Sequence, residues 1–324
     1  MIEYLSNAYK VLIFKSETFK DLIIFIATKE KEMFSTRNQN IINMYKKNTN
    51  YTNKIVYVYV TIGTVGIVGF FLIPLINNIV IPFGYNNVTG VKEHHFIMHT
   101  WFPFDANKYY WVTYFVQLTG CFYGYAYIIY CGAFFLTVLT FVTCQLKILQ
   151  YLLENFQSYA EKMKVQFSLT KEQSETVLVK KLIMDHMNCI SFVHKLNDSV
   201  KMFMLMNFLI SSFQLSLVIY EIFLIPLVNR IPIFLFFVTL SIQLFLIYNS
   251  AHEIKIQNEN VGVAIFKSEW YALNPKVAKA MQMMMVRAQR PLVMTIGPMG
   301  EVNVTSLIQI FKAIYSYACL ILRH

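Results

Sequence analysis

Long uncharged stretches alternate with charged segments along the chain, and each stretch is long enough for a membrane-spanning helix. Such a helix needs about 20 mostly apolar residues, because no backbone amide can stay unpaired in hydrocarbon. We expect five spans, at Ile55–Ile76, Gln117–Thr143, Met202–Tyr220, Ile231–Ser250 and Val302–Leu322. The first four are uncharged, and the fifth contains only Lys312. The pattern predicts an all-α fold, a polytopic bundle of transmembrane helices.

The first 50 residues follow a different pattern, which does not add a sixth span. Residues 11–26 place apolar side chains at helical spacing, but charged side chains interrupt them, at Lys15, Glu17, Lys20 and Asp21. This pattern is typical of an amphipathic helix that lies beside the bilayer or under a bundle. We do not expect a secretory signal, because Glu3 and Lys10 interrupt any short apolar core and no small-residue cleavage site follows.

The composition agrees with a membrane protein. Of 324 residues, 56% are hydrophobic and 14% are charged, whereas a soluble domain has about 25% charged residues. The mean hydropathy is +0.46. The five cysteines show no metal-ligand spacing, and four of them lie in or next to apolar stretches. We interpret them as small buried residues rather than as a disulfide framework.

Lysine and arginine are distributed unevenly among the segments that separate the spans. Residues 1–54 hold 9, 77–108 hold 2, 147–201 hold 8, the link near Arg230 holds 1, and 251–301 hold 6. Because basic residues in short loops stay on the cytoplasmic side, we expect a cytoplasmic N-terminus and an extracellular C-terminus. The glycosylation sequon at Asn87 lies in the predicted outer loop, whereas those at Asn50, Asn197 and Asn303 lie on the predicted inner side. The net charge of +10 fits an inner face that meets anionic lipid, so we expect the lipid bilayer as a partner and no nucleic acid.

Enzyme motifs are absent from the sequence. There is no GxSxG, HExxH, phosphate-binding glycine loop or paired-cysteine motif. His94, His95 and His99 lie near Glu93, but a loop gives such a cluster no fixed geometry, and we predict neither a metal site nor a cofactor. The sequence indicates a protein that moves or senses something, and not an enzyme.

The last 60 residues carry the most specific motifs. They are Phe266-Lys-Ser-Glu-Trp270-Tyr271, Arg287-Ala288-Gln289-Arg290-Pro291 and, after a glycine turn, Lys312-Ala313-Ile314-Tyr315-Ser316-Tyr317. In residues and in order, these motifs closely resemble the insect odorant receptor family, which consists of seven-helix chemosensory receptors that are ligand-gated cation channels. The segment from Trp101 to Gln117 is similar to the family's loop before its fourth helix, so the resemblance covers roughly residue 50 to the C-terminus.

The resemblance implies a receptor subunit that binds volatile odorants and gates a non-selective cation channel. It further implies a hetero-oligomer, a tetramer, with a common co-receptor in the plasma membrane of olfactory sensory neuron dendrites. Three regions follow: 1–54 as a cytoplasmic amphipathic segment, 55–250 as the ligand-binding bundle, and 251–324 as a cytoplasmic anchor region with the pore helix. The family has two spans before the one at 55–76, so we expect the first helix and most of the second to be missing, either from the protein or by truncation of the sequence.

The last span has polar residues along one helical face, at spacings of 4, 3, 4, 3 and 4, which are Thr305, Gln309, Lys312, Ser316, Cys319 and Arg323. A charge in mid-membrane costs about 2.5–3.5 kcal/mol, so Lys312 needs water or a partner. A polar stripe on an otherwise apolar span fits a pore wall, and the resemblance implies that this helix lines the channel. We take the first four of these residues as candidate pore-lining residues. The alternative is a stripe packed against neighbouring helices, with Lys312 reaching for the cytoplasmic interface.

An odorant pocket needs aromatic and aliphatic walls with one or two polar groups. The resemblance places it among the spans in their outer half, and the candidate ligand residues are Gly63, Gly66, Phe70, Phe122, Tyr125, Phe234 and Phe237. Here the two glycines leave space that Phe70 closes, and the tyrosine hydroxyl supplies a polar group. The alternatives are plain membrane packing for the aromatic residues and close helix–helix approach for the glycines.

By the same resemblance, subunits pack around the basic helix 276–290, with Trp270, Tyr271 and Pro291 as candidate assembly residues. Two other interpretations stay open: a gustatory-type chemoreceptor, whose usual C-terminal ending is missing after Tyr317, and a truncated, non-signalling membrane protein. A G-protein-coupled receptor is disfavoured, because its C-terminus would be cytoplasmic.

Overall fold

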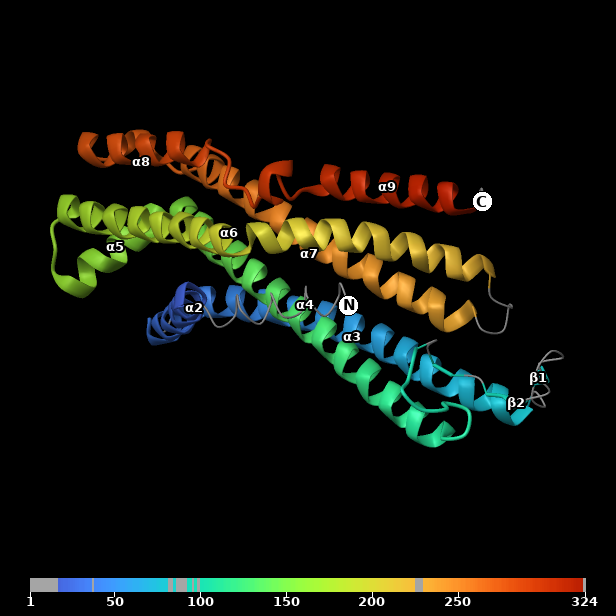
Figure 1. Cartoon of the computed structure of the whole chain (residues 1–324). Coiled ribbons are helices and arrows are strands. Elements are labelled where there is room, and N and C mark those ends of the chain that lie inside the picture. The colour runs from blue at the N-terminus through green and yellow to red at the C-terminus, as the bar shows by residue number, and fades with distance from the viewer. Residues whose placement is uncertain are drawn as a thin grey trace. The chain divides into compact units, whose positions relative to one another are not determined.

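Long helices make up most of the chain (Figure 1). The computed structural model describes residues 17–36, 38–80, 84–85, 92–94, 96–97, 100–224 and 230–322. Its α-helices are α2 (Glu17–Ser35), α3 (Gln39–Val80), α4 (Tyr110–Glu154), α5 (Phe156–Phe167), α6 (Lys171–Leu224), α7 (Arg230–Lys267), α8 (Pro275–Ala288) and α9 (Val304–Leu322). Two 3-10 helices are η2 (Trp270–Ala272) and η3 (Gly297–Met299). Strand β1 (Gly84–Tyr85) pairs antiparallel with β2 (Lys92–Glu93), so the predicted all-α fold is confirmed apart from one two-residue pair.

The predicted spans fall in five of these helices. Within the described residues, α3, α4, α6 and α7 are long and apolar enough to cross a membrane, and each contains one predicted span. The fifth prediction falls on α9, which begins at Val304 rather than at Val302 and is a shorter apolar helix over Val304–Leu320. The hydrophobic lengths alone therefore locate each of the five helices.

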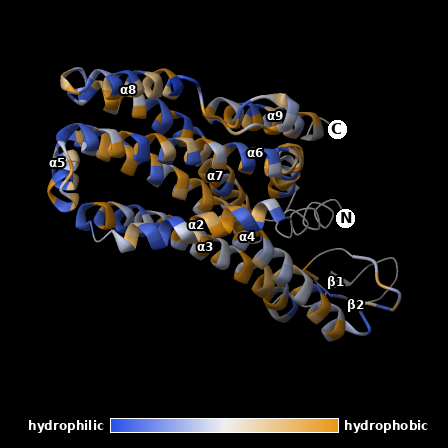
Figure 2. Ribbon diagram, turned by 90° about the vertical axis from the view of Figure 1, so that its left-hand side faces the viewer, coloured by the Kyte–Doolittle hydropathy of each residue, from blue (hydrophilic) through white to orange (hydrophobic). Residues whose placement is uncertain are grey.

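Several helices continue well beyond the apolar stretch that predicts them. Helix α6 has 54 residues, and its first part, residues 171–201, belongs to the segment predicted to lie inside the cell. A capping box fixes its start: Gln173 N donates to Thr170 Oγ1 (3.3 Å), and Thr170 N donates back to Gln173 Oε1 (3.0 Å). Because α6 contains no glycine or proline, nothing interrupts it between its polar start and its apolar end. Figure 2 shows this change of polarity along the long helices, and a largely hydrophilic α5.

The chain divides into two compact units. Unit 1 comprises Met1–Asn53, Phe135–Ile210 and Phe245–Phe311, and unit 2 comprises Lys54–Phe134, Ser211–Leu244 and Lys312–His324. Five helices run through both units, so the division does not follow the functional regions predicted from the sequence. Those regions, 1–54, 55–250 and 251–324, stay a prediction.

Helix α2 packs in unit 1 along the apolar face that its sequence predicts. Phe19 and Leu22, three residues apart, are buried. The Phe25 ring lies 5.4 Å from the Phe192 ring of α6, measured between centroids. The described part of the predicted amphipathic segment is therefore a helix with one buried face, and residues 11–16 lie outside the described residues.

A buried amide links three parts of unit 1. Asn258 of α7 is fully buried, and its Nδ2 donates to the carbonyl oxygens of Ala288 (2.9 Å) and Arg290 (3.1 Å) at the end of α8. Its Oδ1 lies 3.0 Å from Nε2 of His186 on α6. One side chain thus satisfies two carbonyls at a helix C-terminus and connects α6, α7 and α8.

We expect Asn258→Ala to destabilise the protein by about 2–4 kcal/mol, because it leaves the buried Ala288 carbonyl, the part-buried Arg290 carbonyl and the buried His186 imidazole without this partner. Thermal unfolding of the purified protein in detergent measures this change. The control is Glu259→Ala, which changes the exposed neighbour on the same helix. Equal unfolding temperatures for the two variants would show that the amide does not hold these helices together.

Candidate ligand site and polar helix face

Helix α9 separates an apolar buried face from a polar exposed one. The buried face consists of Leu307, Ile310, Ile314 and Ala318, each at most 5% exposed. The exposed face contains all four predicted pore residues, Thr305, Gln309, Lys312 and Ser316, followed by Cys319. Their spacing puts the two sets on opposite sides of one helix. The packing of α9 on the rest of the chain thus leaves the polar stripe uncovered, and the stripe is not a seam against the chain's own described helices.

A tight turn in unit 1 fixes where α9 begins. Residues Thr295 and Glu301 form an antiparallel bridge, and between them Gly297 and Gly300 have positive φ angles of 50° and 124°. Asn303 then caps α9, since its side chain accepts a hydrogen bond from Ser306 N at 2.8 Å.

The same turn is held by α6 and α7. Asn197 of α6 accepts a hydrogen bond from Thr295 N at 2.8 Å, and Lys255 of α7 pairs with Glu301 at 3.1 Å. A Cβ on Gly297 would lie 3.3 Å from the Leu205 side chain, so this position needs glycine for both its backbone conformation and its close contact. The glycine turn predicted from the sequence is therefore the element that positions the polar helix.

Four of the predicted ligand residues make close contacts in unit 2. The Tyr125 hydroxyl covers Gly63, where a Cβ would lie only 2.8 Å from Oη. The same hydroxyl lies 3.1 Å from Thr64 Oγ1 and donates to Val60 O at 3.2 Å. Helices α3 and α4 are thus joined at a polar group inside a span.

Gly66 and Phe70 lie further along α3 and contact α7. A Cβ on Gly66 would lie 3.5 Å from Leu235 Cβ, and the rings of Phe70 and Phe236 meet edge to face at 6.0 Å. Phe237 is half-buried, whereas Phe122 and Phe234 are 54% and 55% exposed. The structure therefore brings the glycines, Phe70 and Tyr125 into helix contacts, but it leaves two of the predicted aromatic residues on the surface of the chain.

A second polar cluster in unit 2 was not predicted from the sequence. Tyr59 is 2% exposed, and its hydroxyl has no hydrogen-bond partner in the part of the chain that the structure describes. A Cβ on Gly132 would lie 3.4 Å from this hydroxyl and 2.9 Å from Gln243 Nε2. Side chains from α3 and α7 thus converge on a glycine of α4. The position of Tyr59 one turn before Gly63 is a sequence signal that could have revealed it.

The predicted assembly residues lie around α8 in unit 1. Trp270 is half-buried, while Tyr271 and Pro291 are exposed, and the two aromatic rings lie 6.4 Å apart. Asn274 caps α8 by accepting from Lys276 N, and its Nδ2 donates to Glu172 of α6 at 2.7 Å.

The two faces of α8 differ in burial. Its apolar face, which includes Met281 and Met284, is buried in unit 1. The opposite face exposes Lys279, Met283 and Val286, and Arg290 is exposed just after the helix ends. This exposed surface is the one through which we predict that subunits pack. The predicted glycosylation site Asn87 and the last stripe residue Arg323 lie outside the described residues.

Most of the chain matches the model of a known protein family. The model of the family described as 7tm odorant receptor matches residues 8–315. The chain belongs to the odorant receptor family. The family consists of membrane receptors and not of enzymes, which agrees with the transmembrane helices described above.

Curated relatives of this odorant receptor chain share moderate identity with it. It is 27% identical to Odorant receptor 10 of Aedes albopictus over 215 residues, which cover 66% of this chain and 56% of the relative. It is also 27% identical to Odorant receptor Or2 of Anopheles gambiae over 150 residues, 45% of this chain and 39% of the relative. The matched region thus spans about half the length of these relatives or less.

A solved structure has the same fold. The insect olfactory receptor OR5 from Machilis hrabei in complex with eugenol superposes with a TM-score of 0.80 and 16% sequence identity. The match covers 99% of this chain and 79% of that receptor. At this identity the likeness concerns the fold, and it supports the predicted transmembrane bundle.

We expect Gly63→Ala to lower the unfolding temperature of the purified receptor, because the new methyl group would displace the Tyr125 ring and break its two hydrogen bonds. Overpacking of this kind costs about 1–3 kcal/mol. Gly124→Ala on α4 is the matched control, since no heavy atom lies within 4 Å of its added Cβ. The double variant Gly63→Ala/Tyr125→Phe should recover part of the loss. If the Gly63→Ala and Gly124→Ala variants unfold at the same temperature, the contact between Gly63 and Tyr125 does not contribute to stability.

Proposed function

We propose that this odorant receptor chain is an olfactory subunit that binds small volatile odorants and gates a non-selective cation channel together with a co-receptor. The observation that carries the proposal is the uncovered polar stripe of α9, opposite a face that is buried in the chain itself. Relatives named as odorant receptors support the same function.

Energetics favour water on one side of α9. If the exposed face met lipid, Lys312 alone would cost about 2.5–3.5 kcal/mol, and Gln309 and Ser316 would add to it. A water-filled path removes this cost. Exposed apolar residues flank the stripe on both sides: Ile308 and Tyr315 on one, Tyr317 and Leu320 on the other. Neighbouring subunits covering those flanks would close a ring with the stripes facing its centre, and we propose a hetero-tetramer with the co-receptor.

The odorant site we propose lies in unit 2, among the predicted ligand residues. Phe70 and Phe237 provide aromatic surface, and Gly63 and Gly66 remove side-chain bulk from α3. The Tyr125 hydroxyl is already bonded within the chain, whereas the Tyr59 hydroxyl is not. Tyr59, in the inner half of its predicted span, and Ser241 of α7 each have a buried hydroxyl without a partner among the described residues, so either can bond to a polar atom of a ligand that reaches it. Small, mostly apolar molecules with one oxygen match this lining.

The charge pattern supports an orientation in the membrane. We propose that the N-terminus and the segments 144–201 and 251–301 lie in the cytoplasm, with the C-terminus outside. Membership of the odorant receptor family supports a location, which we propose to be the plasma membrane of olfactory sensory neuron dendrites.

Mutations can test the proposed pore and the proposed odorant pocket independently. We expect Gln309→Lys to change cation permeability ratios and leave the order of preferred odorants unchanged, because it adds charge to the proposed pore wall. Phe70→Ala should do the reverse. Voltage-clamp recording of cells that express each variant with a co-receptor, tested on one odorant panel, measures both properties. If Gln309→Lys reorders the odorants and leaves permeation unchanged, the stripe is not a pore wall.

Assembly should depend on the residues around α8. We expect Trp270→Ala and Pro291→Ala to reduce co-purification with the co-receptor several-fold, since truncated anchor side chains at interfaces commonly cost more than about 1–2 kcal/mol. Thermal unfolding of each variant alone controls for misfolding. Val165→Ala, at an exposed position of α5, is the comparison for a surface change elsewhere. Undiminished co-purification of both variants would contradict an assembly role.

A further inference from the structure

A cavity of about 100 Å³ lies in unit 1, whereas the proposed odorant site lies in unit 2. Its walls come from α2, the start of α3, the second half of α4 and the first half of α6. None of the seven predicted ligand residues is among its described lining residues. The cavity therefore needs an interpretation of its own.

Most of the lining is apolar. Ten of its seventeen described lining residues are aliphatic, aromatic or sulfur-containing. Three aromatic rings lie next to one another, with centroid distances of 5.4 Å for Phe25–Phe192 and 6.1 Å for Phe141–Phe192. Val142 and Leu149 of α4 continue this wall, and both are buried. An enclosed apolar cavity of about 150 Å³ holds a benzene molecule. At about 100 Å³ and partly open to the surface, this cavity can hold a small ring or alkyl group only in part.

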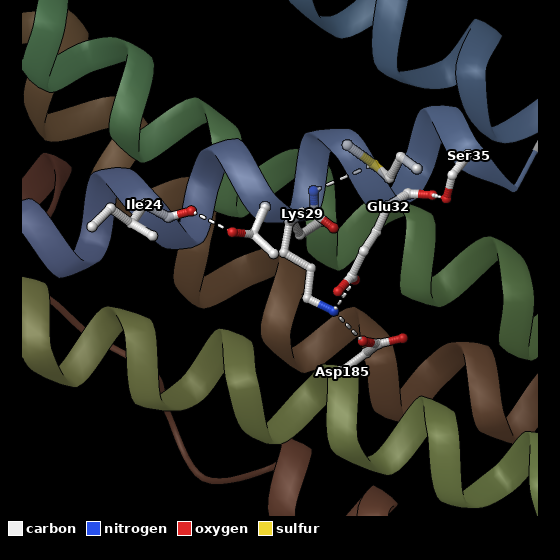
Figure 3. Close-up of polar contacts among 8 residues, drawn as sticks. Ile24, Lys29, Glu32, Ser35 and Asp185 are labelled. Atoms are coloured by element: carbon white, nitrogen blue, oxygen red, sulfur yellow. Dashed lines mark hydrogen bonds and ion pairs between the residues drawn. The ribbon is translucent and has the colours of Figure 1, made fainter.

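The charged groups on the lining are already balanced. Figure 3 shows the Lys29 ammonium between two carboxylates, with Nζ 2.9 Å from Glu32 Oε2 and 3.0 Å from Asp185 Oδ1. Burial lowers the pKa of Lys29, but the hydrogen bonds and charges of Glu32 and Asp185 raise it by more, so this ammonium stays charged. Lys181, one turn before Asp185, is the other charged lining residue. Lys181 makes no ion pair among the described residues, but it is exposed to water, so the lining holds no buried unpaired charge. A charged ligand would therefore enter without a buried counter-ion, at a desolvation cost.

Uncharged hydrogen-bonding capacity remains on the same wall. The amide nitrogen of Gln145 donates only to the Met33 sulfur, at 3.5 Å, and sulfur is a weak acceptor. The Asn188 side-chain amide, also on the lining, has no partner among the described residues. A neutral polar atom could therefore bond here without displacing a strong contact.

We propose that this cavity binds small neutral organic molecules that carry one hydrogen-bonding group, such as phenols and short alkanols. The ring or alkyl part lies among Phe25, Phe141 and Phe192, and the oxygen bonds to the amide of Gln145 or Asn188. Because α2 forms one wall, an occupant links α2 to α4 and α6 and stabilises their contact. The site is distinct from the odorant pocket of unit 2 and does not depend on whether the channel conducts.

The test uses phenol and the reactivity of Cys189, a lining residue that is 8% exposed. Because Cys189 lines the cavity, an occupant blocks the approach of N-ethylmaleimide to its thiol, and we expect phenol to slow the alkylation at least threefold in the purified receptor. Cys319, which is exposed on α9, is the internal control, and its rate should not change. Peptide mass spectrometry gives both rates in one sample. No effect of phenol on Cys189, up to the highest concentration at which the protein stays folded, would overturn the proposal.

Two variants and two charged probes sharpen the result. Val142→Leu adds bulk to the cavity and should abolish the protection of Cys189 by phenol. Val165→Leu, at an exposed position of α5, should leave that protection unchanged.

Gln145→Leu keeps the shape of the wall and removes the amide, so phenol should bind about 3- to 10-fold more weakly while benzene binds as before. Benzoate and benzylamine should protect Cys189 less than phenol does. Equal protection by either ion, or full protection in Val142→Leu, would refute the site as described.

Discussion

Backbone amides in hydrocarbon have no water to bond to, and this constraint accounts for most of the architecture. It requires each span to be a helix, and it makes an interrupted helix costly. Outside the hydrocarbon the constraint no longer applies. There α4 reaches 45 residues and α6 reaches 54 because residues 144–154 and 171–201 contain no glycine or proline that would interrupt them. Once the helices have formed, each can still rotate about its own axis. Glycines and a small number of buried polar contacts determine which rotation the structure adopts.

The two units use different contacts. In unit 1, two side-chain amides bond to the backbone of other elements: Asn258 satisfies two carbonyls, and Asn197 accepts from the backbone of the turn before α9. Such contacts specify one arrangement, because a shifted helix would leave a buried group unpaired. The hydroxyl of the buried Tyr248, also in unit 1, has no partner among the described residues. In unit 2, the contacts near Gly63 and Gly66 are close helix approaches, and the Tyr59 hydroxyl has no partner among the described residues.

The sequence predicts the features that depend on one helix alone. The five spans follow from hydrophobic length, and the α9 stripe follows from spacing, since its polar residues are exposed as a set opposite Ile310 and Ile314. The sequence does not predict contacts that depend on how two helices rotate against each other. The meeting of Tyr59 and Gln243 at Gly132 is one such contact. The pairing of Lys29 with Asp185, which are 156 positions apart, is another.

Prediction of the ligand residues was limited for the same reason. Gly63, Gly66 and Phe70 share a face of α3 by spacing, and that face does contact α4 and α7. Phe122 and Phe234 were assigned by resemblance, and their exposure depends on a rotation that the sequence does not encode locally.

Polar groups without a partner in the chain indicate where water, a ligand or another subunit can bind. Among the described residues they include the Tyr248 hydroxyl of unit 1 as well as the Tyr59 hydroxyl of unit 2. A membrane protein cannot leave Lys312 or the Tyr59 hydroxyl uncompensated without a cost of a few kcal/mol. In unit 1 that cost is removed by contacts such as the Lys29 ion pair. On α9 and around Tyr59 it is removed only by water, a ligand or another subunit. Natural proteins break local rules chiefly at functional sites, so these unsatisfied groups favour a pore along α9 and a binding site in unit 2. The same reasoning distinguishes the cavity of unit 1. Its buried charges are paired with one another, its remaining lysine, Lys181, is exposed to water, and its free groups are neutral amides, so it suits neutral molecules.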